Sequence, residues 1–272
     1  MKKINVTKGF TLIELLVVIS IIALLLSILL PALSKVKDQA KFILCQSNLR
    51  SYGIVGVMYA TDNGGSLPYP WASIYNALDL PGEGGARQCR WHNPKYDLTR
   101  YPEYAGPLWP YLEVKDINLC PTFKSMAYTI GAGHFGHSSS VPEIVPQFGY
   151  SMNGFLGVDG GSSDGRNFRV EKISKVAHPA TVFFFAEENM LIDKDEPWSI
   201  AVLNDNALIS QWSNPKIVIN PPPRPAPFLD SFATFHKAKS ANLNDGVSNA
   251  VFTDGHVEQV DVRDTHKLSW PY

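Results

Sequence analysis

The chain has 272 residues, of which 45% are hydrophobic and 11% aromatic, so it is long enough and apolar enough to fold around a sizeable core. Its formal net charge of −1 argues against a general nucleic-acid-binding protein, and no nucleic-acid partner is expected. Charged residues make up only 18% of the chain, as expected of a protein with a membrane segment.

The first predicted element is an apolar helix near the N-terminus. The run from Phe10 to Leu33 would be about 36 Å long as a helix, enough to cross a hydrocarbon core of about 30 Å. Glu14 lies inside this run, where a carboxylate is disfavoured by roughly 2.5–3.5 kcal/mol. A cleaved secretory signal would be shorter and would end in a small-x-small site, and a plain anchor would explain neither Glu14 nor the Gly-Phe junction.

The stretch KGFTLIE at residues 8–14 resembles the class III signal of type IV prepilins and type II secretion pseudopilins. The resemblance implies that a prepilin peptidase/methyltransferase cuts between Gly9 and Phe10 and methylates the new terminus of Phe10. Glu14 matches the family glutamate, and Pro31 matches the proline that kinks the pilin helix. The implied partners are this enzyme, other pilin or pseudopilin subunits and inner-membrane lipid.

The charges around this signal suggest a role for Glu14. Basic residues before the apolar run keep the N-terminus in the cytoplasm, which leaves the head in the periplasm. After cleavage, the amine of Phe10 and the carboxylate of Glu14 are each costly to bury alone. We therefore hypothesise that Glu14 of one subunit pairs with the Phe10 amine of the next and specifies subunit register.

The helix is expected to continue beyond the membrane to about Ala60, because apolar residues recur at roughly helical spacing. Gly53 and Gly56 each cost about 1 kcal/mol in a helix, and the segment 62–65 (DNGG) is a stop signal. This plan predicts an α+β, pilin-like fold with a long N-terminal helix packed on an antiparallel β-sheet head with long loops. The expected divisions are a leader at 1–9, a transmembrane helix at 10–33, an amphipathic half at 34–62 and a globular head at 63–272.

Two short stretches extend the resemblance. Residues 45–50 (CQSNLR) and 59–64 (YATDNG) are similar to segments of pilin-like proteins from planctomycetes and verrucomicrobia. Their local chemistry has a plainer interpretation, in which Asn48 and Arg50 lie on a solvated helix face and residues 62–64 only cap the helix. The pattern therefore indicates family and not catalysis.

The three cysteines are Cys45, Cys89 and Cys120, and none has the C-x-x-C spacing of a structural zinc site, so no metal and no cofactor are expected. A periplasmic head would permit one disulfide. Cys45 and Cys120 are the preferred pair because both lie in family-like stretches, which leaves Cys89 as the odd thiol. Three buried thiols are the alternative.

The region from residue 67 to 120 is rich in Pro, Gly and aromatic residues without a regular period. It is predicted to form ordered loops with short helices, whose aromatic side chains make a packed mini-core, with a glycan or peptide groove as the alternative. Strands are predicted at 148–153, 181–186 and 216–219. Residues 131–137 and 159–165 are predicted to be exposed loops, and calcium binding at Asp159 and Asp164 is an unfavoured alternative because the EF-hand pattern is absent.

Residues 249–260 predict a β-hairpin, in which Asp254-Gly255 favours a tight type I′ turn. Asp254, Gly255 and His256 also resemble the signature of a C-terminal H-x9-DG pilin-like domain. In that group a histidine stands nine residues before the Asp-Gly pair, whereas His236 lies farther from it here. Any role for His236 borrowed from the group is therefore not supported by spacing.

A catalytic or metal site could be built from His236, Asp254 and His256, with Glu187 and Glu188 as additional ligands. The turn chemistry already explains Asp254, and nucleophile motifs such as G-x-S-x-G are absent. No enzymatic activity is therefore predicted. The predicted function is a structural pilin-like or pseudopilin subunit, and the alternative is a membrane-tethered binding or metal-dependent enzymatic head exported by a pilin signal.

Overall fold

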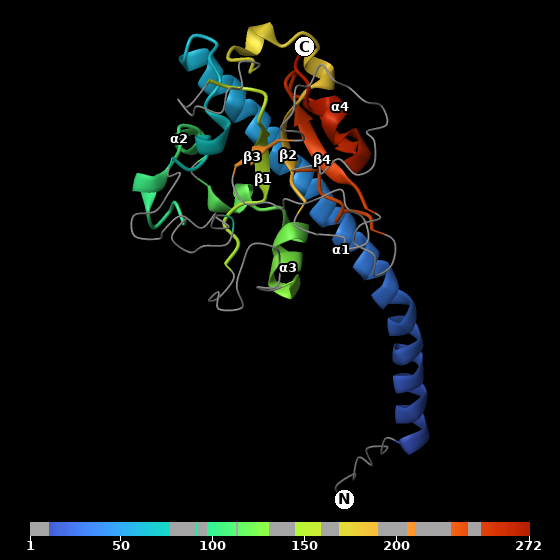
Figure 1. The fold of residues 1–272 in the computed structure, drawn as a ribbon. Coiled ribbons are helices and arrows are strands. Elements are labelled where there is room, and N and C mark those ends of the chain that lie inside the picture. Colours follow the sequence, from blue (N-terminus) through green and yellow to red (C-terminus); the bar gives the residue numbers. More distant parts are fainter. Residues whose placement is uncertain are drawn as a thin grey trace, which may run out of the picture. The chain divides into compact units, whose positions relative to one another are not determined.

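The computed structural model describes residues 11–76, 91, 97–112, 114–130, 145–158, 169–189, 206–209, 230–238 and 246–272. Within these ranges a long N-terminal helix, α1 (Leu12–Asp62), is followed by a five-stranded sheet, as Figure 1 shows. The predicted α+β class is therefore confirmed. The chain divides into two compact units, Met1–Lys41 and Phe42–Tyr272, and α1 begins in the first and ends in the second.

The described part of the first unit is helical, as its composition predicts. Leu, Ile, Val and Ala dominate the sequence from residue 12 to 33. The hydroxyls of Ser20 and Ser27 donate hydrogen bonds to backbone carbonyls one turn earlier, at 2.8 and 2.7 Å. The few polar groups of this stretch are thus satisfied within the helix itself.

α1 ends at the segment that the sequence marks as a stop. Gly64 and Gly65 adopt φ angles of 62° and 85°, which glycine tolerates because it has no Cβ. The Gly65 amide donates to the carbonyl oxygen of Ala60 at 2.7 Å, and the side-chain amide of Asn63 donates to that of Tyr59 at 2.8 Å. The interpretation of this segment as a helix cap is confirmed.

The sheet has the strand order β3-β1-β2-β4-β5. Adjacent strands pair antiparallel except for β3, which runs parallel to β1. The sheet is therefore mixed, and the prediction of a wholly antiparallel sheet is wrong at β3, a two-residue strand too short to show a sequence pattern. The strands are β1 (Tyr150–Asn153), β2 (Phe183–Glu187), β3 (Ala207–Leu208), β4 (Ser248–Phe252) and β5 (Val257–Val260).

The strands predicted at 148–153 and 181–186 correspond to β1 and β2, and the predicted hairpin corresponds to β4 and β5. The candidate strand at 216–219 and the predicted loops at 131–137 and 159–165 lie outside the described residues. All five residues of β2 are buried and three of them are aromatic, so the strand shows a continuous apolar run in place of an alternating pattern.

A β-bulge in β2 distributes its aromatic side chains between two cores. The register against β4 shifts between Phe183 and Phe185. As a result Phe184 and Phe185 both belong to the core under α1, where the Phe185 ring lies 5.1 Å from that of Tyr52. Phe183 and Ala186 belong to a second core on the opposite face. One additional residue in a bulge places two consecutive side chains on one face in this way.

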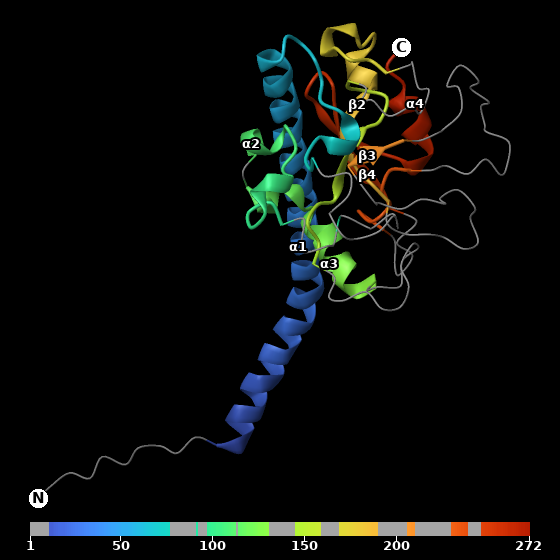
Figure 2. The same ribbon diagram turned by 60° about the vertical axis from the view of Figure 1, so that its left-hand side comes forward.

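The second half of α1 and the short helix α4 (Thr265–Ser269) cover opposite faces of the sheet, and Figure 2 shows β2 and β4 between them. Leu268 of α4 packs against the core that contains Phe183. On the other face, α1 contributes Cys45, Leu49, Tyr52 and Val55 to the core. Their spacing of three or four residues is that of one helical face.

Gly53 and Gly56, which the sequence indicates only as residues that weaken a helix, are points of close approach between α1 and the sheet. A Cβ at Gly56 would lie 2.2 Å from Cε1 of Phe184, and a Cβ at Gly53 would lie 2.6 Å from Cγ2 of Val251. The absence of side chains therefore lets the helix backbone approach β2 and β4. Close packing against the sheet offsets the helix-propensity cost of these glycines.

Gly56→Ala should lower the free energy of unfolding by up to about 2 kcal/mol, because overpacking of about 1–3 kcal/mol exceeds the gain in helix propensity of about 1 kcal/mol. Urea unfolding of the full chain in detergent, followed by tryptophan fluorescence, measures this. Ser47→Ala, at an exposed position of the same helix, is the matched control and should cause no loss. A Gly56→Ala variant more stable than the wild type would show that Phe184 does not limit how closely α1 packs on the sheet.

The hairpin is confirmed, but its predicted type I′ turn is wrong. The Gly255 amide donates to the Phe252 carbonyl oxygen, and the Phe252 amide donates to that of His256, both at 2.9 Å. Gly255 has a φ of 92°, whereas Asp254 is not among the residues with positive φ. A type I′ turn needs positive φ at both central residues, so this is a three-residue loop with glycine at its left-handed position.

The part of the chain that follows α1 and precedes the first strand in sequence contains short helices and a buried aromatic cluster. Trp91 and Tyr75 are buried, and the Trp91 ring packs 5.3 Å from that of Phe123. This packing favours the predicted aromatic mini-core over a groove in the described part of the region. Among the described residues of the whole chain, the other helices besides α1 and α4 are α2 (Trp109–Leu112), α3 (Pro121–Ile130) and the 3-10 segments Pro70–Ala72, Pro102–Tyr104, Lys115–Asn118, Ile173–Lys175, Pro179–Thr181 and Val262–Asp264.

Candidate functional site

The N-terminal site begins with a capping box. The backbone amide and the hydroxyl of Thr11 each donate to the Glu14 carboxylate at 2.8 Å, and the Glu14 amide donates to the Thr11 hydroxyl at 3.2 Å. This reciprocal pair satisfies donors at the start of α1. The T-x-x-E spacing of residues 11–14 is the sequence signal of this capping box. Gly9 and Phe10, where cleavage and methylation are predicted, lie outside the described residues.

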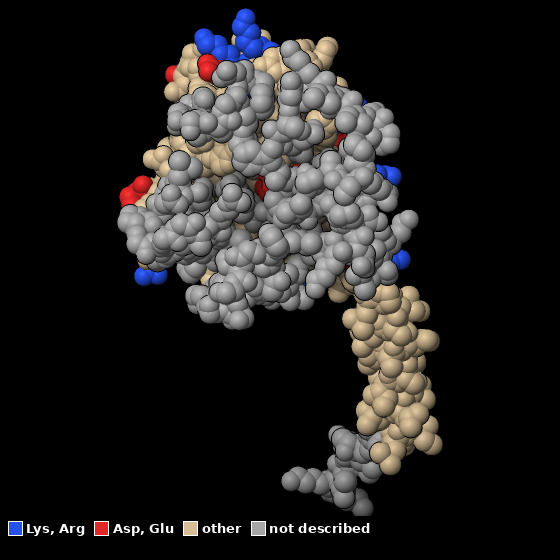
Figure 3. Space-filling model, viewed as in Figure 1, with Lys and Arg blue, Asp and Glu red and all other residues tan. Residues whose placement is uncertain are grey.

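The helix that follows this cap is long and apolar enough to cross a membrane, and it is the one such helix in the part of the chain that the structure describes. All side chains from residue 11 to 40 are exposed. On the face seen in Figure 3 the apolar stretch carries no Lys, Arg, Asp or Glu. Pro31 lies inside the helix, at the position where the resemblance implies a kink.

A second candidate site, made of a disulfide and polar side chains, lies inside the head. Cys45 of α1 and Cys120, just before α3, form a disulfide with a Cα–Cα distance of 4.9 Å. Two hydrogen bonds support the same junction: the Asn48 side chain donates to the Leu119 carbonyl oxygen at 3.2 Å, and the Tyr52 hydroxyl donates to Asn118 at 2.8 Å. Cys89 lies outside the described residues.

These contacts come from one face of α1 and bind one short segment of chain. Residues 45, 48 and 52 are three and four residues apart, so their side chains point the same way. Asn48 is half-buried, and its assignment to a solvated helix face is wrong, whereas Arg50 is exposed as predicted. The reason is tertiary, since the partner of Asn48 is a carbonyl 71 residues away.

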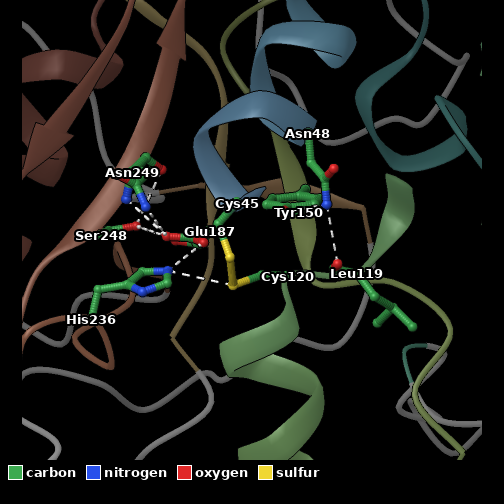
Figure 4. A network of polar contacts seen from close by, with 9 residues as sticks. All are labelled: Cys45, Asn48, Leu119, Cys120, Tyr150, Glu187, His236, Ser248 and Asn249. Carbon is green, nitrogen blue, oxygen red and sulfur yellow. Dashed lines mark hydrogen bonds and ion pairs between the residues drawn. A yellow bond between two sulfur atoms is a disulfide. The ribbon is translucent and has the colours of Figure 1, made fainter. Parts of the chain in front are cut away.

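Glu187, His236 and the disulfide form a buried polar cluster, drawn in Figure 4. His236 Nε2 lies 2.7 Å from Glu187 Oε1 and 3.4 Å from Cys120 Sγ. Glu187 is the last residue of β2, and His236 is positioned by a backbone bridge to Val247, just before β4. The end of β2 and the segment bridged to the chain just before β4 thus bring these two side chains together.

The other oxygen of Glu187 is held by the start of β4. The backbone amide of Asn249 donates to Glu187 Oε2 at 2.8 Å, and its side-chain amide donates at 3.3 Å. The Ser248 hydroxyl donates to the Glu187 backbone carbonyl at 3.1 Å. A fully buried carboxylate requires such donors, because it is costly to leave one without hydrogen bonds.

Two tyrosines stand beside this cluster. Burial and the nearby Glu187 carboxylate raise the pKa of Tyr150 well above its ordinary value, although the hydrogen bond from Asn48 opposes the shift. Burial also raises the pKa of Tyr52. Both hydroxyls therefore remain protonated at neutral pH, and that of Tyr52 acts as a donor to Asn118.

The hairpin residues lie apart from this cluster. His256 Nδ1 pairs with Asp254 Oδ1 at 2.6 Å, and its ring stacks on Phe252. Burial alone would raise the pKa of Asp254, but the hydrogen bonds from the His256 amide and ring outweigh it, and the net pKa is lowered. The site of His236, Asp254 and His256 considered from the sequence is not formed, because His236 lies in the buried cluster and the other two residues lie in the hairpin loop. Among the described residues, the group spaced to hold a metal is Cys45, Cys120, Glu187 and His236.

Sequence reasoning missed this grouping. Glu187 and His236 were considered, but with the wrong partners, and the cysteines were considered only as a disulfide. The signal that could have found it is a Glu at the end of an otherwise apolar strand, since a buried strand end places such a residue inside the core.

Comparison with known proteins identifies one family model. Residues 4–30 match the prokaryotic N-terminal methylation motif. No curated protein and no solved structure matches the chain. The matched motif supports a type IV pilin-like signal at the N-terminus, and together with the apolar helix it fits a membrane-anchored, single-pass protein.

Proposed function

We propose that this chain is a structural subunit of a type II secretion or type IV pilus-like fibre. The match of residues 4–30 to the methylation motif, which includes most of the exposed apolar stretch of α1, carries this proposal. Prepilin peptidase removes residues 1–9 and methylates Phe10, and residues 10–33 then form the membrane anchor. An apolar helix that its own chain leaves exposed needs lipid or other apolar helices around it.

The charge pattern supports an orientation with the N-terminus in the cytoplasm. Lys2, Lys3 and Lys8 precede the anchor, and basic flanks stay on the cytoplasmic side. The amphipathic segment 34–62 and the head, residues 63–272, then lie in the periplasm, where the Cys45–Cys120 disulfide is chemically stable.

The exposed face of α1 within the head unit supports assembly with other subunits. Five large apolar side chains on this face are each at least 41% exposed: Ile43, Leu44, Ile54, Val57 and Met58. Exposed apolar side chains gathered on one helix mark an interaction surface more often than scattered ones do. Contacts with neighbouring pilin-like subunits would cover them.

An enzymatic or ligand-binding head is not favoured by the described residues. Cys45, Cys120, Glu187 and His236 are buried, so a substrate in solution does not reach them. The Asp254–His256 pair is explained by the hairpin loop itself. The resemblance of this hairpin to the H-x9-DG domain stays a prediction about family.

Processing of the N-terminus tests the proposal directly. The full chain is produced in membranes with and without a prepilin peptidase, and its intact mass is measured. With the peptidase the mass should fall by that of residues 1–9 and rise by one methyl group, and Gly9→Val should abolish both changes. Thr11→Ala, two residues beyond the cut, is the matched control and should be processed. A wild-type chain that keeps Met1, or that leaves the membrane fraction, would contradict the proposal.

A further inference from the structure

We infer that the reduced form of the Cys45–Cys120 pair, together with His236 and Glu187, is a buried binding site for one thiophilic divalent cation of the Zn²⁺ type. The four ligand atoms all lie within 4.8 Å of one another. Two cysteine sulfurs, one imidazole nitrogen and one carboxylate oxygen are the donor types of tetrahedral zinc sites.

The four ligand atoms lie near one another, but two pairs are closer than a tetrahedral zinc site requires, so the cluster must widen to hold an ion. With bond lengths typical of zinc, the ligand atoms of a tetrahedron lie about 3.3–3.8 Å apart. His236 Nε2 is 3.4 Å from Cys120 Sγ and 2.7 Å from Glu187 Oε1. Reduction frees the two sulfurs from their bond, and a cation binds only if the four side chains then move apart enough to open the centre of the cluster.

The surroundings of the cluster have the properties of a closed structural site. Cys45, Cys120 and Glu187 are completely buried, and His236 is 2% exposed. The Asn249 amide hydrogen-bonds the second oxygen of Glu187, which fixes the orientation of that carboxylate. Hydrogen bonds of this kind hold a metal ligand in the right orientation and so strengthen metal binding.

Charge balance favours a cation in the reduced state. Two thiolates and one carboxylate carry three negative charges, which a divalent cation reduces to one. The remaining charge is stabilised by the amide donors of Asn249. Without a cation the same thiols must stay protonated in an apolar interior, because burial of unpaired thiolates is costly.

The disulfide and the metal are then alternative occupants of one position. A small-molecule disulfide such as oxidised glutathione accepts two electrons from the two thiolates. The Cys45–Cys120 bond forms, the S–S bond of the reagent breaks, and two glutathione thiolates and the cation are released. The zinc form therefore belongs to the chain before oxidation and the disulfide form to the chain after it.

Metal binding by the full chain in detergent micelles tests this inference. A Cys89→Ser background leaves only the two cysteines of the cluster. The chain is refolded from urea with Zn²⁺ under a non-thiol reductant, because a closed site fills during folding, and is then desalted and analysed for metal. The reduced chain should retain one Zn²⁺ and unfold at a higher temperature than without metal, whereas the oxidised chain should retain none.

Variants and a spectroscopic readout separate coordination from a purely structural role. Co²⁺ in place of Zn²⁺ should show thiolate charge-transfer bands and the visible bands of a tetrahedral ion. His236→Asn and Glu187→Gln should each weaken binding at least tenfold, while His256→Asn at the partly exposed hairpin should not. Their oxidised forms, compared by circular dichroism, show whether the variants fold. If the reduced wild type binds no Zn²⁺, if the oxidised chain binds equally well, or if folded His236→Asn binds unchanged, the inference is overturned.

Discussion

Replacing both Cys45 and Cys120 with alanine should lower the free energy of unfolding of the head by about 4 kcal/mol. The disulfide closes a loop with a sequence separation of 75, and in the chain-entropy model a loop of that length restricts the unfolded chain by about this amount. Alanine is preferred to serine because a buried hydroxyl without a partner would add its own cost.

The double variant should still fold, because the junction is held by more than the disulfide. Asn48 and Tyr52 continue to hydrogen-bond the segment 118–119, and the aromatic packing of Tyr52 on Phe185 is untouched. A loss of about 4 kcal/mol is nonetheless a large fraction of the 5–15 kcal/mol of a typical domain.

Urea unfolding of the full chain in detergent, followed by tryptophan fluorescence, measures the effect as a lower midpoint. Reduction of the wild type in the presence of a metal chelator should reproduce the loss, and the same treatment should not change the alanine variant. Equal midpoints for the oxidised wild type and the variant would show that Cys45 and Cys120 are not linked in the folded protein.

Glu14→Gln should leave membrane insertion intact and strongly reduce assembly with other subunits. Glutamine retains the acceptor that the Thr11 cap uses, so the change removes the charge and spares the helix start. Insertion should not suffer, because the change removes a charge that is itself disfavoured in a membrane span. Assembly, in contrast, would lose the pairing with the Phe10 amine of the neighbouring subunit.

The capping box supplies the matched control for this prediction. Thr11→Ala removes the hydroxyl that bonds Glu14 and leaves the carboxylate charged, so it should assemble like the wild type. Membrane fractionation reports insertion, and chemical cross-linking of adjacent subunits reports assembly. Normal cross-linking of Glu14→Gln would exclude the pairing hypothesis. If both variants failed to assemble, the assembly defect would be due to loss of the helix cap and not to loss of the charge.

The elements readable from the sequence were those with strong local signals. α1 was expected because apolar residues continue for many turns and a DNGG segment ends them. The β4–β5 hairpin was expected because Asp-Gly stands between two apolar runs, although the observed loop has three residues and not two. β3 could not be predicted, since two residues carry no periodicity and its parallel partner is distant in the chain.

The polar cluster of the head was not predictable for the same reason. Glu187, His236 and Cys120 are at least 49 residues apart in sequence, and no motif links them. Their proximity follows from the pairing of β2 with β4 and from the docking of α1 on the sheet. The role of Gly53 and Gly56 also depends on tertiary structure, because they let α1 approach Val251 and Phe184 on distant strands.

The sequence by itself determined the N-terminal signal, the apolar helix with its single carboxylate and the α+β class, because each depends on residues close together along the chain. Three features were decided only by the tertiary structure. Asn48 donates a hydrogen bond to a carbonyl far away in sequence, and two glycines allow α1 to pack closely on the sheet. His236 contacts Glu187 beside a disulfide. Contacts between segments far apart in sequence depend on strand register and helix docking, and local patterns do not encode these.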